Sequence, residues 1–194
     1  MSRDEGARDR ILERIRAASR EREPLPHPGT LPERMAAGDP AERFSEIFEQ
    51  NGGETVRFET LESAWGWLEG FAEDFASMAP GEDVPERLLA SLPVAAPHEA
   101  ELGISMARGG AAETGTLLLD SREGRRGQIL PPAHLVWVRR RDIHATLDRL
   151  LESVKGELPS ALALHSGPSL SADIGQVTVR GVHGPARVIV AILP

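Results

Sequence analysis

The second half of the chain alternates short apolar runs with a helical stripe, and this alternation restricts the fold more than any other feature. The apolar runs have the length and boundaries of strands, and lie at 115–120 (GTLLLD), 135–139 (LVWVR), 161–165 (ALALH), 176–179 and 187–192 (RVIVAI). The helical stripe falls between the second and third runs, and consists of Ile143, Leu147, Leu150, Leu151 and Val154. Strands that are apolar along their length must be covered on both faces. We therefore predict an α/β fold, a three-layer sheet with helices on both faces.

The first half of the folded region supplies helices and one strand. Residues 41–50 predict a short helix, 55–58 a short strand, and 85–91 a further short helix in an acidic, proline-punctuated segment. The strongest helical pattern consists of Leu61, Ala64, Trp65, Leu68, Phe71, Ala72 and Phe75. Aromatic residues at helical spacing usually belong to a core, so we assign this face to packing rather than to a cofactor.

Residues 1–40 have a different pattern from the rest of the chain. Ile11, Leu12 and Ile15 form one narrow apolar face, which predicts a helix that docks on its own domain or on a partner. Seven prolines and glycines between positions 24 and 40 exclude a helix there and indicate an extended linker over 21–40. We therefore divide the chain into an N-terminal helical arm and Pro-rich linker, 1–40, and a single α/β domain, 41–194.

The composition excludes several classes of chemistry. There is no cysteine, so the chain can form neither a disulfide nor a thiolate zinc site, and it can supply neither a cysteine nucleophile nor a Cys-ligated iron–sulfur cluster. No apolar run approaches the ~20 residues of a membrane helix. The charged N-terminus lacks the apolar core of a signal peptide, so a cytoplasmic location is expected.

Charge is distributed unevenly along the chain. The net charge of −8 argues against a nucleic-acid partner. Residues 41–101 contain 14 acidic and 3 basic side chains, whereas residues 102–194 contain 8 acidic and 11 basic ones. We therefore expect any site for an anion to lie in the C-terminal half.

Three clusters rich in glycine, hydroxyl groups and histidine are candidates for ligand binding. They lie at 108–116, 165–174 and 180–185, and we expect them in loops beyond the carboxyl ends of strands, where open α/β sheets bind ligands. Exposed backbone amides and hydroxyl groups in such loops can hold an anion. The candidate ligand-binding residues are Thr114, Gly115, Thr116, Ser166, Gly167, Ser169, Asp173, His183 and Gly184.

Glu113 is the leading candidate for a catalytic residue. It directly precedes the run at 115–120 among small residues, where we expect its carboxylate to be partly buried. Such a group can act as a general base or as a nucleophile. The structural alternative is that the carboxylate binds backbone amides or an arginine and so fixes the turn.

Other readings of the polar residues remain open. A Ser-His-Asp hydrolase built from His165, Ser169, Asp173 or His183 lacks the G-x-S-x-G elbow, and the histidine spacing matches no metal motif. Ser169 or Ser171 could instead cap a helix that begins near Ala172. Structural or solvated roles are also open for His134, for Arg122, Arg125 and Arg126, and for Arg139, Arg140 and Arg141.

Four motifs in order resemble the LUD domain family, and within it the LutC-type lactate utilization proteins. They are AETGTLLLDS at 112–121, LPPAH at 130–134, SGPSLSADI at 166–174 and GVHGP at 181–185. The resemblance covers roughly residues 95–194. It implies the fold of the CoA-transferase and ribose-5-phosphate isomerase group (the NagB/RpiA/CoA-transferase-like fold), which agrees with the α/β prediction.

The resemblance also implies a function in oxidising L-lactate to pyruvate, beside iron–sulfur LutA/LutB-like partner proteins. The expected role is that of a non-redox subunit that binds a small anionic metabolite and carries no cofactor of its own. No nucleic-acid or membrane partner is expected, and an oligomer is compatible with the sequence. Two alternatives stay open. One is a free-standing transferase or isomerase that uses Glu113, by analogy with the glutamate nucleophile of related transferases. The other is a sensor of carboxylate metabolism.

Overall fold

The computed structural model describes residues 3–20, 38–156, 158–172 and 178–194. The chain forms two compact units, Met1–Glu33 and Arg34–Pro194. The first contains the helix α1 (Arg3–Arg20), on which Ile11 and Ile15 are exposed. Most of the predicted linker lies outside the described residues. No helix of the described residues has the length and apolarity needed to span a membrane.

A five-stranded parallel sheet forms the centre of the second unit. Its strand order is β1-β11-β6-β3-β2. The strands are β1 (Glu54–Arg57), β2 (Met78–Pro80), β3 (Leu102–Met106), β6 (Ala133–Arg139) and β11 (Arg187–Leu193). The central pair, β6 and β11, is buried over almost its whole length, as the uninterrupted apolar runs at 135–139 and 187–192 predict.

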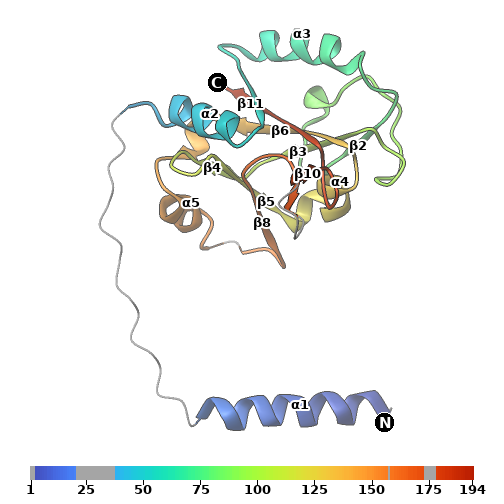
Figure 1. The fold of residues 1–194 in the computed structure, drawn as a ribbon, viewed down its shortest axis with the longest axis vertical. Helices are drawn as coiled ribbons and strands as arrows, with labels where there is room; N and C mark the ends of the chain where they lie inside the picture. The colour runs from blue at the N-terminus through green and yellow to red at the C-terminus, as the bar shows by residue number, and fades with distance from the viewer. Residues whose placement is uncertain (1–2, 21–37, 157, 173–177) are drawn as a thin grey trace. The chain divides into compact units, whose positions relative to one another are not determined.

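The helix α3 (Leu61–Ala72) covers one face of this sheet (Figure 1). It begins at Thr60, whose hydroxyl group accepts a hydrogen bond from the backbone N–H of Ser63 at 3.1 Å. Its buried face packs in one cluster with the side chains of β3 and β6. Phe71 and Phe75 of the predicted stripe are in ring contact, with centroids 5.2 Å apart, and both pack with Trp65 against the buried cluster of the sheet, so their assignment to the core is confirmed. Trp67, which the predicted stripe does not include, stacks on Phe71 and meets Trp137 edge-on.

A second sheet and two helices cover the opposite face. The sheet has the order β7-β4-β5-β8, with β4 (Gly109–Ala111), β5 (Thr116–Asp120), β7 (Ile143–His144) and β8 (Leu162–His165). Phe44 and Phe48 of α2 (Pro40–Gln50) pack in one cluster with Leu117, Leu119 and Val136. On the far side, α5 (Leu147–Ser153) packs its Leu150 against the second sheet.

The layers therefore run from α3 through the parallel sheet and the second sheet to α5 (Figure 1). The predicted α/β fold, a parallel sheet flanked by helices, is confirmed. The second sheet is an addition that the sequence did not indicate, and it lies between the parallel sheet and α5.

Three predicted helices differ from the structure. The helix predicted from Ile143 begins at Leu147, because Ile143 and His144 pair with β4 as β7. Within 85–91 only the single 3₁₀ turn η1 (Glu86–Leu88) forms. Ser171 and Ala172, at the start of the helix predicted near Ala172, lie in β9 (Leu170–Ala172), which pairs antiparallel with β10 (Thr178–Arg180), and residues 173–177 lie outside the described residues. A short helix, α4 (Arg125–Ile129), and a 3₁₀ turn, η2 (Ser121–Glu123), follow β5.

Candidate functional site

Three predicted ligand-binding residues form a continuous chain of hydroxyl groups. The Oγ1 atoms of Thr114 and Thr116 are 2.7 Å apart, and Oγ1 of Thr116 is 2.7 Å from Oγ of Ser166. Thr116 is buried at the start of β5, whereas Thr114 and Ser166 are exposed. This hydroxyl chain (Thr114, Thr116 and Ser166) joins two of the three sequence clusters, which are 50 residues apart at Thr116 and Ser166.

The two glycines beside the hydroxyl chain approach the end of α2. Gly115 has a φ of +59°, and a Cβ there would lie 2.7 Å from the backbone nitrogen of Phe48. Gly167 has a φ of +140°, and a Cβ there would lie 2.9 Å from the carbonyl oxygen of Asn51. The side chain of Asn51 donates a hydrogen bond to the carbonyl oxygen of Thr114 at 3.2 Å. Close packing on α2 thus explains both glycines without a ligand.

Two histidines lie close together, one in each sheet, His134 in β6 and His165 in β8. His165 precedes Ser166, and its ring centroid lies 6.2 Å from that of His134, which is fully buried in β6. Nε2 of His134 is 2.9 Å from Oγ of Ser105, while Nδ1 is buried without a hydrogen-bond partner among the described residues. Burial lowers the pKa of His134 to about 3, with a smaller contribution from His165, and burial also lowers the pKa of His165. Both imidazoles are therefore neutral near pH 7.

The other predicted ligand-binding residues are Ser169, Asp173, His183 and Gly184. Ser169 and Gly184 lie next to the loops that precede β6 and β11. The backbone N–H of Ser169 donates to the carbonyl oxygen of Pro185 at 2.9 Å, and Ala186 donates to Pro132 at 2.9 Å. Gly184 packs against Ser169, since a Cβ at Gly184 would lie 3.2 Å from that of Ser169. His183 is exposed. Asp173 lies outside the described residues, so the hydrolase reading is not tested.

The second and third clusters do not lie at the carboxyl ends of the parallel strands. Pro132 and Pro185 stand just before the first residues of β6 and β11, so these loops gather at the amino ends. The expected position is wrong for a topological reason. His165 ends β8, which belongs to the second sheet and runs antiparallel to β5, so the following loop is not part of the carboxyl edge.

Glu113 caps a helix. Its Oε1 accepts a hydrogen bond from the backbone N–H of Leu147, the first residue of α5, at 2.8 Å. Its own N–H donates to the carbonyl oxygen of Ala145 at 3.1 Å. The residue is exposed, so the expected partial burial is wrong. The contact matches the structural alternative, in which the carboxylate binds a backbone amide, and the catalytic role stays a prediction.

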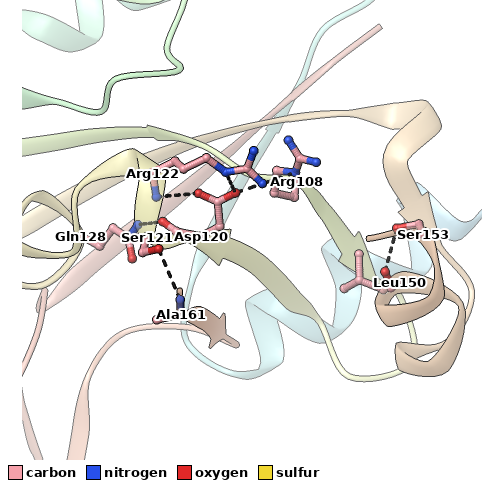
Figure 2. Close-up of polar contacts among 8 residues, drawn as sticks. All are labelled: Arg108, Asp120, Ser121, Arg122, Gln128, Leu150, Ser153 and Ala161. Carbon is pink, nitrogen blue, oxygen red and sulfur yellow. Dashed lines mark hydrogen bonds and ion pairs between the residues drawn. The ribbon is translucent and has the colours of Figure 1, made fainter. Parts of the chain in front are cut away.

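A buried acid and two arginines form a second polar group that the sequence did not indicate. Asp120 ends β5 and is fully buried. Its Oδ1 accepts from the backbone N–H of Arg122 at 2.8 Å, and its Oδ2 accepts from Nε of Arg122 at 3.0 Å (Figure 2). Nε of Arg108 lies 4.0 Å from the same Oδ2. Arg122 thus contacts a buried carboxylate instead of lying in a wholly solvated loop.

No group of three acidic or histidine side chains among the described residues lies close enough to ligate a metal ion. The polar groups that the structure does bring together are hydroxyls, neutral imidazoles and guanidinium ions. Such groups bind anions by donating hydrogen bonds. The hydroxyl chain is therefore the candidate site.

Comparison with known proteins gives relatives that match just under half of the chain. A lactate utilization protein C from Halalkalibacterium halodurans is 37% identical over 98 residues, which are 46% of this chain and 43% of that protein. A lactate utilization protein C from Deinococcus radiodurans is 38% identical over 87 residues, covering 42% of this chain and 41% of that protein. The matched region thus spans less than half the length of these curated relatives.

A solved structure shares the fold over most of the chain. The crystal structure of a DUF162 family protein from Deinococcus radiodurans superposes with a TM-score of 0.62 at 18% identity. The superposition covers 82% of this chain and 99% of that one. The LUD domain profile matches residues 97–193. This match spans half of the chain and includes all three sequence clusters, and the chain therefore belongs to the LUD domain family.

Proposed function

We propose that this chain is a LutC-like, non-redox subunit of a cytoplasmic system that oxidises L-lactate to pyruvate, and that it binds a small carboxylate at the hydroxyl chain. The observation that carries the proposal is the match to proteins named lactate utilization protein C, together with the LUD domain match over residues 97–193, which include the hydroxyl chain. Oxidation of lactate to pyruvate releases two electrons and two protons. A chain without cysteine supplies no thiolate ligands for an iron–sulfur cluster, so LutA/LutB-like partners carry the electrons.

The hydroxyl chain supports a carboxylate ligand through its hydrogen-bond balance. Three hydroxyl groups have three protons, and the two hydrogen bonds between them use two. One proton is left to donate outward, and the residues at the two ends of the hydroxyl chain, Thr114 and Ser166, are exposed. A carboxylate accepts hydrogen bonds only, so it complements this arrangement.

The test is lactate-dependent dye reduction by reconstituted LutA/LutB-like partners, with and without this chain. The proposal predicts that activity requires the chain. Thr116→Val removes the central hydroxyl group at nearly constant volume, and we expect it to raise the lactate concentration needed for half-maximal rate about tenfold. Thr60→Val is the matched control, because Thr60 only caps α3. Equal lactate oxidation by the partners alone would contradict the subunit role.

Glu113→Gln addresses the transferase alternative in the same assay. A glutamine oxygen can still accept the hydrogen bond from Leu147, so the helix cap survives while the nucleophilic carboxylate is lost. We expect unchanged activity, because the carboxylate already caps α5. Loss of all activity in a normally folded Glu113→Gln protein would instead support chemistry at Glu113.

A further inference from the structure

A cavity of about 670 Å³ opens at the carboxyl ends of two parallel strands, apart from the hydroxyl chain. Met106, the last residue of β3, and Arg139, the last residue of β6, line one side, and Ser153 of α5 lines another. Ligands of open α/β sheets bind at this edge. The volume is within the range of about 300–1,000 Å³ that is usual for small-molecule sites.

The cavity is distinct from the candidate site of the proposed function. Thr116 begins β5 and Asp120 ends it. A rise of about 3.3 Å per residue places the two ends of this strand about 13 Å apart. The hydroxyl chain is at the first end, and Arg108 and Arg122, which both line the cavity, contact Asp120 at the other. One small ligand does not reach both sites.

The arginines of the cavity are held in place before any ligand arrives. Asp120 has no exposed side-chain surface and binds Arg122 through both of its oxygens. Figure 2 shows the guanidinium groups of Arg108 and Arg122 on the same side of the Asp120 carboxylate. These side chains are 31% and 44% exposed, so part of each faces solvent. A buried carboxylate that fixes two arginines lowers the entropy cost of binding an anion between them.

A third arginine extends the positive wall. Arg139 lies 3.8 Å from Asp142, a carboxylate that Arg141 also approaches to 3.8 Å. The charged residues of the lining are three arginines and two aspartates, Asp83 and Asp142, besides His144. The arginines of the lining outnumber its aspartates, while the buried Asp120 beneath the cavity contacts two of the arginines.

We propose that this cavity binds a multiply charged organic oxyanion, a phosphate ester or a polycarboxylate, with its anionic group between Arg108 and Arg122. Guanidinium groups match both kinds of oxyanion through paired N–H donors. Arg139 contacts a second anionic oxygen, and the hydroxyl group of Ser153 and the ring of His144 contact the remainder of the ligand. The site is additional to the proposed carboxylate site and does not depend on it.

The test is isothermal titration calorimetry of the full chain with pyrophosphate and, separately, with citrate, at constant ionic strength set by sodium chloride. We expect saturable binding of at least one of the two probes, which also decides between phosphate and carboxylate chemistry. Removing a charged hydrogen-bond donor costs a factor of about ten or more in affinity. Arg108→Gln and Arg139→Gln should therefore each weaken binding by at least about tenfold.

Two controls distinguish binding at this cavity from a general effect of positive charge and from misfolding of a variant. Arg43→Gln removes the same charge from the exposed surface of α2 and should leave the affinity unchanged. Arg139 is on the rim of the cavity, so its variant keeps the contacts of Asp120 and stays informative if Arg108→Gln fails to fold. The proposal would be overturned if neither pyrophosphate nor citrate bound saturably. It would also be overturned if Arg43→Gln lost as much affinity as the variants of the cavity arginines.

Discussion

The side chain of Glu113 shows how one carboxylate satisfies a helix end. The first backbone N–H groups of a helix have no partner within it, and Glu113 binds that of Leu147. Glu113→Ala removes this partner and should lower the free energy of unfolding by about 1 kcal/mol. Glu113→Gln keeps an acceptor and should change it by less than half as much. Urea denaturation of both variants checks the prediction, and equal stability of the alanine variant and the wild type would show that the cap is dispensable.

His134 makes the stability of the fold depend on pH. Its pKa is lowered to about 3 in the folded protein, mainly by burial, from about 6.5 in an unfolded chain. Below pH 6.5 the unfolded chain therefore binds a proton that the folded protein does not, and stability falls as the pH falls. Between pH 7.5 and 5.5 this single group should cost about 1.4 kcal/mol.

The matched variant is His134→Gln, which keeps a polar group near Oγ of Ser105 but does not titrate. Its free energy of unfolding, measured by urea denaturation at pH 7.5, 6.5 and 5.5, should fall less steeply than that of the wild type. His98→Gln, at an exposed position, should keep the wild-type slope. A variant of His134 with the full wild-type slope would contradict the assignment.

At the scale of elements, the turn between β4 and β5 depends on the close approach of Gly115 to α2. Gly115→Ala places a Cβ 2.7 Å from the nitrogen of Phe48 at a positive φ. The left-handed conformation alone costs about 1–2 kcal/mol, so with the clash we expect a loss of about 2 kcal/mol or more. Gly66→Ala in α3 is the control of opposite sign. A Cβ there has no neighbour within 4 Å, and alanine should stabilise the helix by about 0.5–1 kcal/mol. Thermal denaturation of both variants tests the difference.

The helices and strands that the sequence predicts are those whose conformation follows from the pattern of their own residues. β5, β6 and β11 are apolar almost throughout, and α3 has both a helical stripe and a capping threonine. β4 was not predicted, because the pattern Gly-Gly-Ala has no strand signal. Its conformation depends on distant contacts, since a Cβ at Gly109 would lie 2.5 Å from the carbonyl oxygen of Asp142. β7 is two residues long and exists only by pairing with β4.

The polar residues of the two sites also divide into those that a local sequence pattern indicates and those that only the fold brings together. Glycine, serine and threonine clustering was enough to single out Thr114, Thr116 and Ser166, although it placed Ser166 at the wrong end of the sheet. The neighbours of Asp120 and Arg108 in the sequence do not predict that the two are partners, because they meet only when β4 pairs antiparallel with β5. The one local signal was an acid at the end of an apolar strand, and that acid is fully buried.

At the scale of the whole molecule, the described part of the C-terminal unit carries two separate polar sites. The hydroxyl chain lies near the amino ends of the parallel strands, and the arginine-lined cavity lies at their carboxyl ends. The strand β5 of the second sheet connects the two sites, because it supplies Thr116 to the hydroxyl chain and Asp120 to the arginines of the cavity. The two proposed anion sites therefore lie at opposite edges of the domain, while its central strands stay buried.

The helix α1 has a narrow apolar face, for which the sequence predicts docking either on the chain's own domain or on a partner protein. Docking on the proposed partners gives the following prediction. Ile11 and Ile15 are 59% and 55% exposed, on a helix otherwise rich in arginine and acidic residues. The double substitution Ile11→Ser and Ile15→Ser should greatly reduce co-purification of the LutA/LutB-like partners with the tagged full chain from the native host. Glu13→Ser, at another exposed position of α1, should retain the partners. Full retention by the double variant would show that α1 is not the docking helix, and an equal loss in Glu13→Ser would indicate a charge effect instead.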